Sequence, residues 1–105
     1  MVEPQGTLVL LILKTLARGP NHGFGIALHI QSVSDGLLQV EEGSLYPALH
    51  RLERDKLVSA AWKVTGNKRR ARYYKLTPAG RKWLSKAERN WDAMAKGVGR
   101  VLRFA

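Results

Sequence analysis

The stretch Glu41–Leu57, EEGSLYPALHRLERDKL, decides the fold, because it predicts one short helix with two chemically different faces. At about 100° per residue, one side of this helix is apolar and suits packing against a core. That side carries Leu45, Ala48, Leu49 and Leu52. The opposite side carries Pro47, His50 and Arg54, flanked by Tyr46 and Arg51. We therefore expect a helix that packs through one face and presents polar groups to a partner through the other.

Pro47 limits where this helix begins, because a proline is tolerated mainly in the first turn, where its missing N–H is not needed. Ser44 is then the expected N-cap, with its hydroxyl accepting from the next backbone N–H groups. Roughly 12 residues at 1.5 Å each give a rod about 18 Å long, which fits a DNA major groove about 12 Å wide.

The composition indicates one basic domain of 105 residues. The net charge is +10; residues 1–40 are neutral, while 41–77 and 78–105 carry +5 each. No cysteine is present, which suits a reducing compartment and excludes a thiolate nucleophile. The apolar run at residues 8–13 is too short to span a bilayer, and the N-terminus lacks a secretory signal pattern. We expect a soluble, cytoplasmic protein.

Two helices are expected before the organising stretch. Residues 7–17, TLVLLILKTLA, are apolar around almost the whole circumference, so this helix needs cover from its own core or, in part, from another subunit. The turn at residues 18–21 ends it. A second helix is predicted over residues 22–33, and residues 37–40 suit a brief strand. The packing set predicted for the second helix is Phe24, Ala27, Leu28 and Ile30.

After Lys56 the apolar period changes from helical to alternating, which predicts two strands joined by a turn. The first strand places Val58, Ala60, Trp62 and Val64 on one face, and the second covers residues 71–76. The connection at residues 65–70, TGNKRR, contains Gly-Asn turn chemistry. Residues 63–75 hold six basic side chains and no acid, a repulsion that an anionic partner or open solvent relieves. Solubility is the alternative explanation, although intermixed Lys and Glu would serve it equally well.

A last helix is predicted from Thr77 as N-cap and Pro78 as its first residue. Apolar residues then recur at steps of three and four, as in a coiled-coil seam, and we expect this seam to pack on a second copy of the chain. The seam consists of Leu84, Ala87, Trp91, Met94, Val98 and Val101. Gly97 and Gly99 each cost about 1 kcal/mol relative to Ala in a helix, so the helix is predicted to Lys96 and its continuation is left open.

The sequence offers little chemistry for an enzyme. His22, His29 and His50 lack metal-ligand spacing, and no serine lies in a nucleophile motif. We expect no enzyme activity, no metal and no cofactor. Trp62 and Trp83 are predicted in the core, whereas Trp91 either packs between subunits or forms a flat wall for a planar ligand.

The order of three helices, a basic hairpin and a fourth helix predicts a mainly α fold with a small β-hairpin wing. Residues 1–77 are expected to form a winged helix-turn-helix domain and residues 78–105 a dimerisation helix. In such a fold the third helix enters the major groove and the hairpin contacts the flanking backbone. The residues expected to contact DNA are Ser44, Tyr46, Pro47, His50, Arg51, Arg54, Lys68, Arg69, Arg70 and Arg72.

These residues divide by chemistry. Arg69, Arg70 and Arg72 suit phosphate oxygens, which fix position without reading sequence. Tyr46, His50 and Arg51 are placed to meet base edges. For Arg51 and Arg54 the alternatives are a phosphate contact or an ion pair with a neighbouring acid of the same helix.

The segments LLILKTLARGPNHGFGIA, EEGSLYPALHRLERDKLVSA and KRRARYYKLTPAGR together resemble the PadR family of bacterial transcriptional regulators. The resemblance covers nearly the whole chain and is closest to the short branch, which has a single C-terminal helix. It implies a homodimeric winged helix, usually a repressor, in which the C-terminal helix packs on the partner's first helix. It also implies that the dimer can enclose an apolar space for a small aromatic or drug-like effector. The residues expected at the dimer interface and effector site are Leu8, Ile12, Leu84, Ala87, Trp91, Met94 and Val98.

The leading hypothesis is therefore a sequence-specific regulator that binds double-stranded DNA at a pseudo-palindromic operator, acts as a homodimeric repressor and is relieved by a small planar effector. One alternative is a basic winged-helix module that binds another protein and has only non-specific affinity for DNA. Another is a small RNA-binding protein, which would need exposed aromatic residues on a sheet, where Tyr73 is the main candidate.

Overall fold

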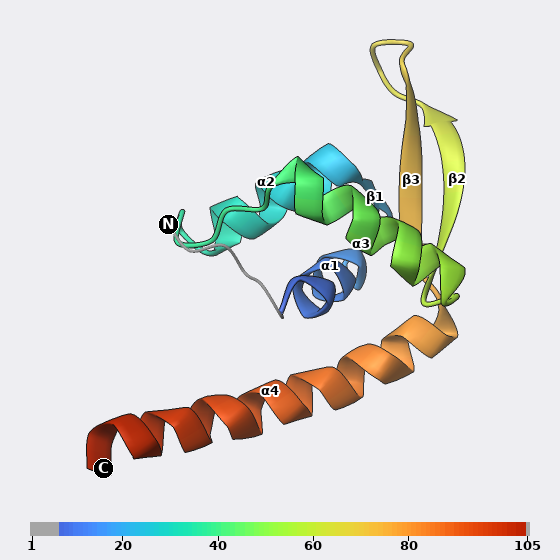
Figure 1. The fold of residues 1–105 in the computed structure, drawn as a ribbon. Helices are drawn as coiled ribbons and strands as arrows, with labels where there is room; N and C mark the ends of the chain where they lie inside the picture. The colour runs from blue at the N-terminus through green and yellow to red at the C-terminus, as the bar shows by residue number, and fades with distance from the viewer. Residues whose placement is uncertain (1–6, 105) are drawn as a thin grey trace.

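The computed structural model describes residues 7–104, which form a mainly helical fold with a small antiparallel sheet (Figure 1). Helix α1 lies between α3 and α4, and the β2–β3 hairpin projects beyond the helices. The elements are α1 (Leu8–Leu16), β1 (Asn21–His22), α2 (Gly23–Val33), α3 (Glu42–Arg54), β2 (Val58–Val64), β3 (Arg70–Leu76) and α4 (Pro78–Phe104). The predicted winged helix with a long C-terminal helix is confirmed.

One core holds these elements together. Helix α3 buries the apolar face predicted for it, and α1 contributes three residues that are at most 1% exposed. The core consists of Ile12, Leu13, Leu16, Ile26, Ile30, Leu45, Ala48, Leu49, Leu52, Val58, Tyr74, Leu76 and Leu84. Much of the predicted cover for the first helix thus comes from its own chain.

Helix α3 begins two residues before the predicted N-cap, so the assignment of Ser44 as the cap was wrong. The N-cap is Glu41, whose carbonyl oxygen accepts from the N–H groups of Ser44 and Leu45 at 3.0 and 2.9 Å. Pro47 consequently lies inside the helix. The missing N–H of Pro47 removes one intrahelical hydrogen bond. The hydrogen bonds of the first turn and the burial of the apolar face stabilise the helix by more than this loss.

The register predicted for α2 was also wrong in part. Phe24 and Leu28 are 62% and 50% exposed, whereas Ile26 and Ile30, one turn apart, are buried. His22 is the N-cap, because its Nδ1 accepts from the N–H of Gly25 at 3.0 Å. Residues 37–40 form no strand beyond a single bridge residue at Leu38.

The sheet has the order β1-β3-β2, and both pairs are antiparallel. Strands β2 and β3 pair from Val58↔Leu76 at the base to Val64↔Arg70 near the tip. Only the base of the hairpin reaches the core, so Trp62, predicted as a core residue, is 55% exposed. Its core assignment was wrong because the hairpin extends past the helices that would cover it (Figure 1).

Helix α4 begins as predicted and continues without a break through both of its distal glycines to Phe104. The Thr77 hydroxyl oxygen accepts from the N–H of Gly80 at 3.0 Å, which confirms the N-cap. Leu84 is buried, but Trp83, which was predicted in the core, is 43% exposed. The assignment of Trp83 was wrong because only one narrow stripe of the first turns of α4 contacts the core.

Candidate nucleic-acid interface

The outer face of α3 presents the side chains that the sequence assigned to it. Tyr46, Pro47, His50, Arg51 and Arg54 are all exposed, while the opposite face of the same helix is buried. The apolar side packs the helix onto the core, and the imidazole of His50 and the guanidinium groups of Arg51 and Arg54 lie on the exposed side, whereas the hydroxyl of Tyr46 lies against Gly23. Such groups form hydrogen bonds with base edges and phosphates.

Arg54 has a neighbour on its own helix end. Its Nε lies 3.6 Å from Oδ1 of Asp55, and both side chains are more than half exposed. Exposed pairs of this kind contribute little and exchange easily for another anion. The alternative of a local ion pair therefore leaves Arg54 available to a phosphate. Ser44 is only partly buried and lies in the first turn of α3.

The hairpin carries a cationic tip. The tip is closed by two backbone bonds, from Thr65 N to Arg69 O at 2.7 Å and from Lys68 N to Thr65 O at 2.9 Å. Lys68 adopts a left-handed backbone conformation with φ of 60°. The side chains of Lys68, Arg69 and Arg70 are exposed, and the three ion pairs of the described residues all lie elsewhere. Their charge is therefore uncompensated and attracts an anionic partner.

Aromatic rings are interleaved with these cations along the hairpin. The guanidinium carbons of Arg70 and Arg72 lie 5.1 and 5.6 Å from the ring centroid of Trp62. Lys63 Nζ lies 5.3 Å from the centroid of Tyr73. Cation–π contacts of this kind hold the cationic groups in place without neutralising them. Trp62 was not predicted as a surface residue. The available signal in the sequence was its distance from the hairpin base together with the arginines in and next to the predicted second strand.

Arg72 differs from the other wing arginines, because it is bound within the protein. Its Nη2 donates to Oε2 of Glu53 at 2.6 Å, and each side chain is about one third exposed. Glu53 belongs to the last turn of α3, so this ion pair joins the hairpin to that helix. The structure thus places Arg72 between the two elements of the interface rather than at the tip.

A cavity of about 340 Å³ lies between α3, the hairpin and the start of α2. The ring of Tyr46 closes it against Gly23, where an added Cβ would come within 2.8 Å of Tyr46 Cε1. Tyr74 also borders the cavity and is 2% exposed. Burial raises the pKa of the Tyr74 hydroxyl, and Glu53 adds to this while Arg72 opposes it. The hydroxyl is therefore neutral at physiological pH.

The residues predicted at the dimer interface and effector site separate into two groups. Ile12 and Leu84 are at most 5% exposed inside the protomer, so they cannot contact a second subunit in this conformation, and that part of the prediction was wrong. Leu8 and Ala87 are partly buried. The exposed members are Trp91, Met94 and Val98, which are 43%, 59% and 50% exposed along α4. The apolar seam therefore continues beyond the part of α4 that its own core covers.

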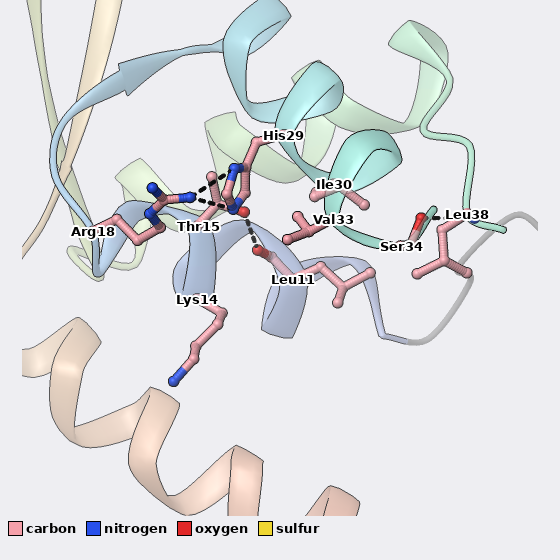
Figure 2. A pocket seen from close by; sticks show the side chains of 9 residues that line it. All are labelled: Leu11, Lys14, Thr15, Arg18, His29, Ile30, Val33, Ser34 and Leu38. Carbon is pink, nitrogen blue, oxygen red and sulfur yellow. Dashed lines mark hydrogen bonds between the residues drawn. The ribbon is translucent and has the colours of Figure 1, made fainter. Parts of the chain in front are cut away.

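A second cavity, of about 400 Å³, lies between α1 and α2 and shares no residue with the predicted effector site (Figure 2). It is lined by Leu11, Lys14, Thr15, Arg18, His29, Ile30, Val33, Ser34 and Leu38. Its polar groups are largely bonded within the protein, as in the contact of Arg18 Nη1 with His29 Nδ1 at 3.1 Å. Lys14 points towards α4, where its Nζ lies 3.1 Å from Glu88 Oε1.

Other kinds of site are not found in residues 7–104. This part of the chain contains no cluster of three or more His, Asp or Glu side chains arranged to hold a metal ion. Among its helices, none combines the length and the apolar character needed to cross a bilayer.

Comparisons with known proteins identify the sequence pattern. Residues 12–86 match the family described as the transcriptional regulator PadR-like family. The chain is 37% identical over 89 residues to the transcriptional regulator Rv3488 of Mycobacterium tuberculosis, covering 85% of this chain and 79% of that protein. It is 44% identical over 96 residues to an uncharacterized 37.1 kDa protein in transposon TN4556 of Streptomyces fradiae, covering 91% of this chain but only 25% of that longer protein.

Solved structures agree with the fold. A PadR family transcriptional regulator from Eggerthella lenta superposes with a TM-score of 0.78 at 34% identity, over 96% of this chain and 86% of that one. Bacillus subtilis PadR in complex with operator DNA superposes with a TM-score of 0.69 at 22% identity, over 76% of this chain and 45% of that one.

Proposed function

The chain belongs to the PadR-like family of transcriptional regulators, and from this premise we propose that it binds double-stranded DNA sequence-specifically and represses transcription as a homodimer. The observation that carries the proposal is the exposed polar face of α3 beside a hairpin with uncompensated cations. Helix α3 reads base edges in the major groove, and the hairpin tip binds the adjacent phosphates. The operator complex of Bacillus subtilis PadR supports double-stranded DNA as the partner.

The proposed DNA contacts divide into base contacts and phosphate contacts according to the positions of the side chains. His50 and Arg51 face the bases with the 39% exposed Tyr46 beside them, while Lys68, Arg69 and Arg70 bind phosphate. Ser44 lies in the first turn of α3, where the positive end of the helix dipole also favours a phosphate, and Pro47 lies on the exposed face beyond it.

The homodimer forms through α4 in this proposal. Several large apolar side chains of α4 are at least 43% exposed in the single chain. Monomeric soluble proteins rarely expose so many apolar side chains along one element. The exposed side chains of α4 that share one face are Trp91, Met94, Val98, Val101 and Leu102. A second copy covers them with its own α4 and α1, so residues 1–77 act as the DNA-binding part and residues 78–105 as the dimerisation part. The two recognition helices then meet half-sites about 34 Å apart, or a multiple of that spacing, in a pseudo-palindromic operator.

A small planar effector fits the same interface. The indole of Trp91 offers a flat apolar surface beside Met94 and Val98, and an aromatic molecule held between two such surfaces changes the separation of the recognition helices. Effector binding therefore weakens the complex with DNA.

The deciding experiment is a selection of bound sequences from a pool of random duplexes, performed with the purified full chain of known oligomeric state. We expect one pseudo-palindromic sequence with half-sites about one helical turn, or a multiple of it, apart. Recovery of no common sequence would reject sequence-specific binding. If light scattering then also gave a monomer, the alternative of a protein-interaction module with general affinity for DNA would replace this proposal.

A further inference from the structure

The wing is attached to the recognition helix by more than the chain that connects them. The connection consists of residues 55–57, and the buried contacts of the hairpin, at Val58, Tyr74 and Leu76, lie at its base. Farther along β3, Arg72 donates to Glu53 at 2.6 Å. This ion pair fastens the middle of the hairpin to the last turn of α3.

The same arginine is held from a second side. Trp62 is its cross-strand partner in the sheet, and the indole lies 5.6 Å from the guanidinium carbon. The guanidinium thus has a carboxylate on α3 and an aromatic ring on β2 as neighbours. A charge-assisted hydrogen bond that is only one third exposed is stronger and less screened than a pair on the open surface.

We propose that Glu53 and Arg72 are positioning residues that fix the wing relative to α3, so that Arg72 acts on DNA binding through the hairpin rather than as a phosphate ligand. The inference rests on the proposed function for its effect on DNA. The attachment itself is a property of the free protein. The phosphates are left to Lys68, Arg69 and Arg70 at the tip, whose side chains are exposed.

Whether DNA binding becomes weaker or stronger when the Glu53 carboxylate is removed separates this proposal from an effect of net charge alone. Glu53 is an acid beside the interface, so its removal by Glu53→Gln would strengthen DNA binding if only net charge mattered. If the carboxylate positions the wing, the same substitution weakens binding. Asp55→Asn is the matched control, because Asp55 is also near the end of α3 and, among the described residues, its carboxylate pairs only with the exposed Arg54 and forms no ion pair with the hairpin.

The experiment measures fluorescence anisotropy with a labelled 30-base-pair duplex of mixed sequence over a range of salt concentrations. We expect Glu53→Gln to weaken binding by about fivefold or more, and Asp55→Asn to leave it within about twofold of the wild type. Arg72→Gln should weaken binding with an unchanged salt slope, whereas Arg69→Gln should lower the slope by about 0.9. The double variant Glu53→Gln/Arg72→Gln should bind no more weakly than Arg72→Gln alone. Where Arg72→Gln fails to fold, Arg72→Lys keeps the charge and removes the planar fork.

Hydrogen exchange of the free protein provides a readout that is independent of DNA. Amides of residues 58–76 should exchange faster in Glu53→Gln and Arg72→Gln than in Asp55→Asn. Unchanged exchange, tighter DNA binding by Glu53→Gln, or a lower salt slope in Arg72→Gln would overturn the proposal. If the wild type did not bind this duplex, the phosphate contacts of the proposed function would be rejected, and the exchange data alone would decide whether the ion pair positions the wing.

Discussion

The backbone of Gly80 packs directly against the carbonyl oxygen of Leu57, so closely that a Cβ atom at position 80 would overlap this oxygen. The same carbonyl accepts from the N–H of Thr77 at 3.1 Å and lies 3.0 Å from the Thr77 hydroxyl. One peptide oxygen thus joins the start of α4 to the segment that leads from α3 into the hairpin.

A methyl group at this joint would overlap the backbone carbonyl of Leu57 and crowd the side chain of Leu76, so the Leu57 backbone must move. We expect Gly80→Ala to lower the free energy of unfolding by about 1–3 kcal/mol, although alanine is the better helix former. Gly97→Ala is the matched control in the same helix, since nothing lies within 4 Å of a Cβ there. It should raise stability by about 0.5–1 kcal/mol. Urea denaturation measures both values, and effects of the same sign would contradict the packing described.

The buried hydroxyl of Tyr74 gives a pH dependence. Because burial raises its pKa above the ordinary value near 10, the unfolded chain ionises first as the pH increases. Tyr74 therefore removes stability above about pH 10 and has no effect on the slope below it. We expect the difference in unfolding free energy between the wild type and Tyr74→Phe to be constant from pH 7 to 9. At pH 11 the wild type should lose stability relative to Tyr74→Phe. Parallel curves over this whole range would refute the assignment.

The two classes of DNA contact should respond differently to substitution. Arg70→Glu reverses a charge on the exposed wing, so it should weaken binding to every duplex and reduce the salt slope. Arg51→Ala removes a potential base contact from α3, so it should change the order of preference among duplexes, by about 1–3 kcal/mol at the affected base pair. Competition assays with a panel of single-base variants of the selected site measure both effects. The same loss on all duplexes for both variants would show that Arg51 does not read sequence.

Periodicity predicted the elements of this fold because burial is decided locally by the spacing of apolar residues. Leu45, Ala48, Leu49 and Leu52 repeat with a helical period and are buried together. The cap at Thr77 was predictable for the same reason, since Thr-Pro fixes a helix start within the chain itself. The exposed face of α3 followed from the buried one.

The features that could not be predicted from the sequence depend on how elements far apart in the chain lie in space. The short strand β1 exists only because β3 passes beside residues 21–22, and two residues carry no period of their own. Trp62 lies on the same face of the strand as Val58 and Ala60, yet it is exposed because the hairpin extends beyond the helices that cover its base. The pairing of Glu53 with Arg72, 19 residues away in sequence, likewise required the structure.

The exposed stripe of α4 predicts the effect of a single charge on assembly. Trp91→Glu places a carboxylate where the proposed dimer buries an indole, so the dissociation constant should rise at least about 100-fold, or about 2.7 kcal/mol. Ala93→Glu introduces the same charge about 160° around the helix from Trp91 and should leave the dimer intact. Neither residue is part of the core, so circular dichroism should give the same helix content for both variants. Light scattering over a dilution series distinguishes them, and a wild type that is monomeric, or a Trp91→Glu variant that dimerises like Ala93→Glu, would exclude α4 as the interface.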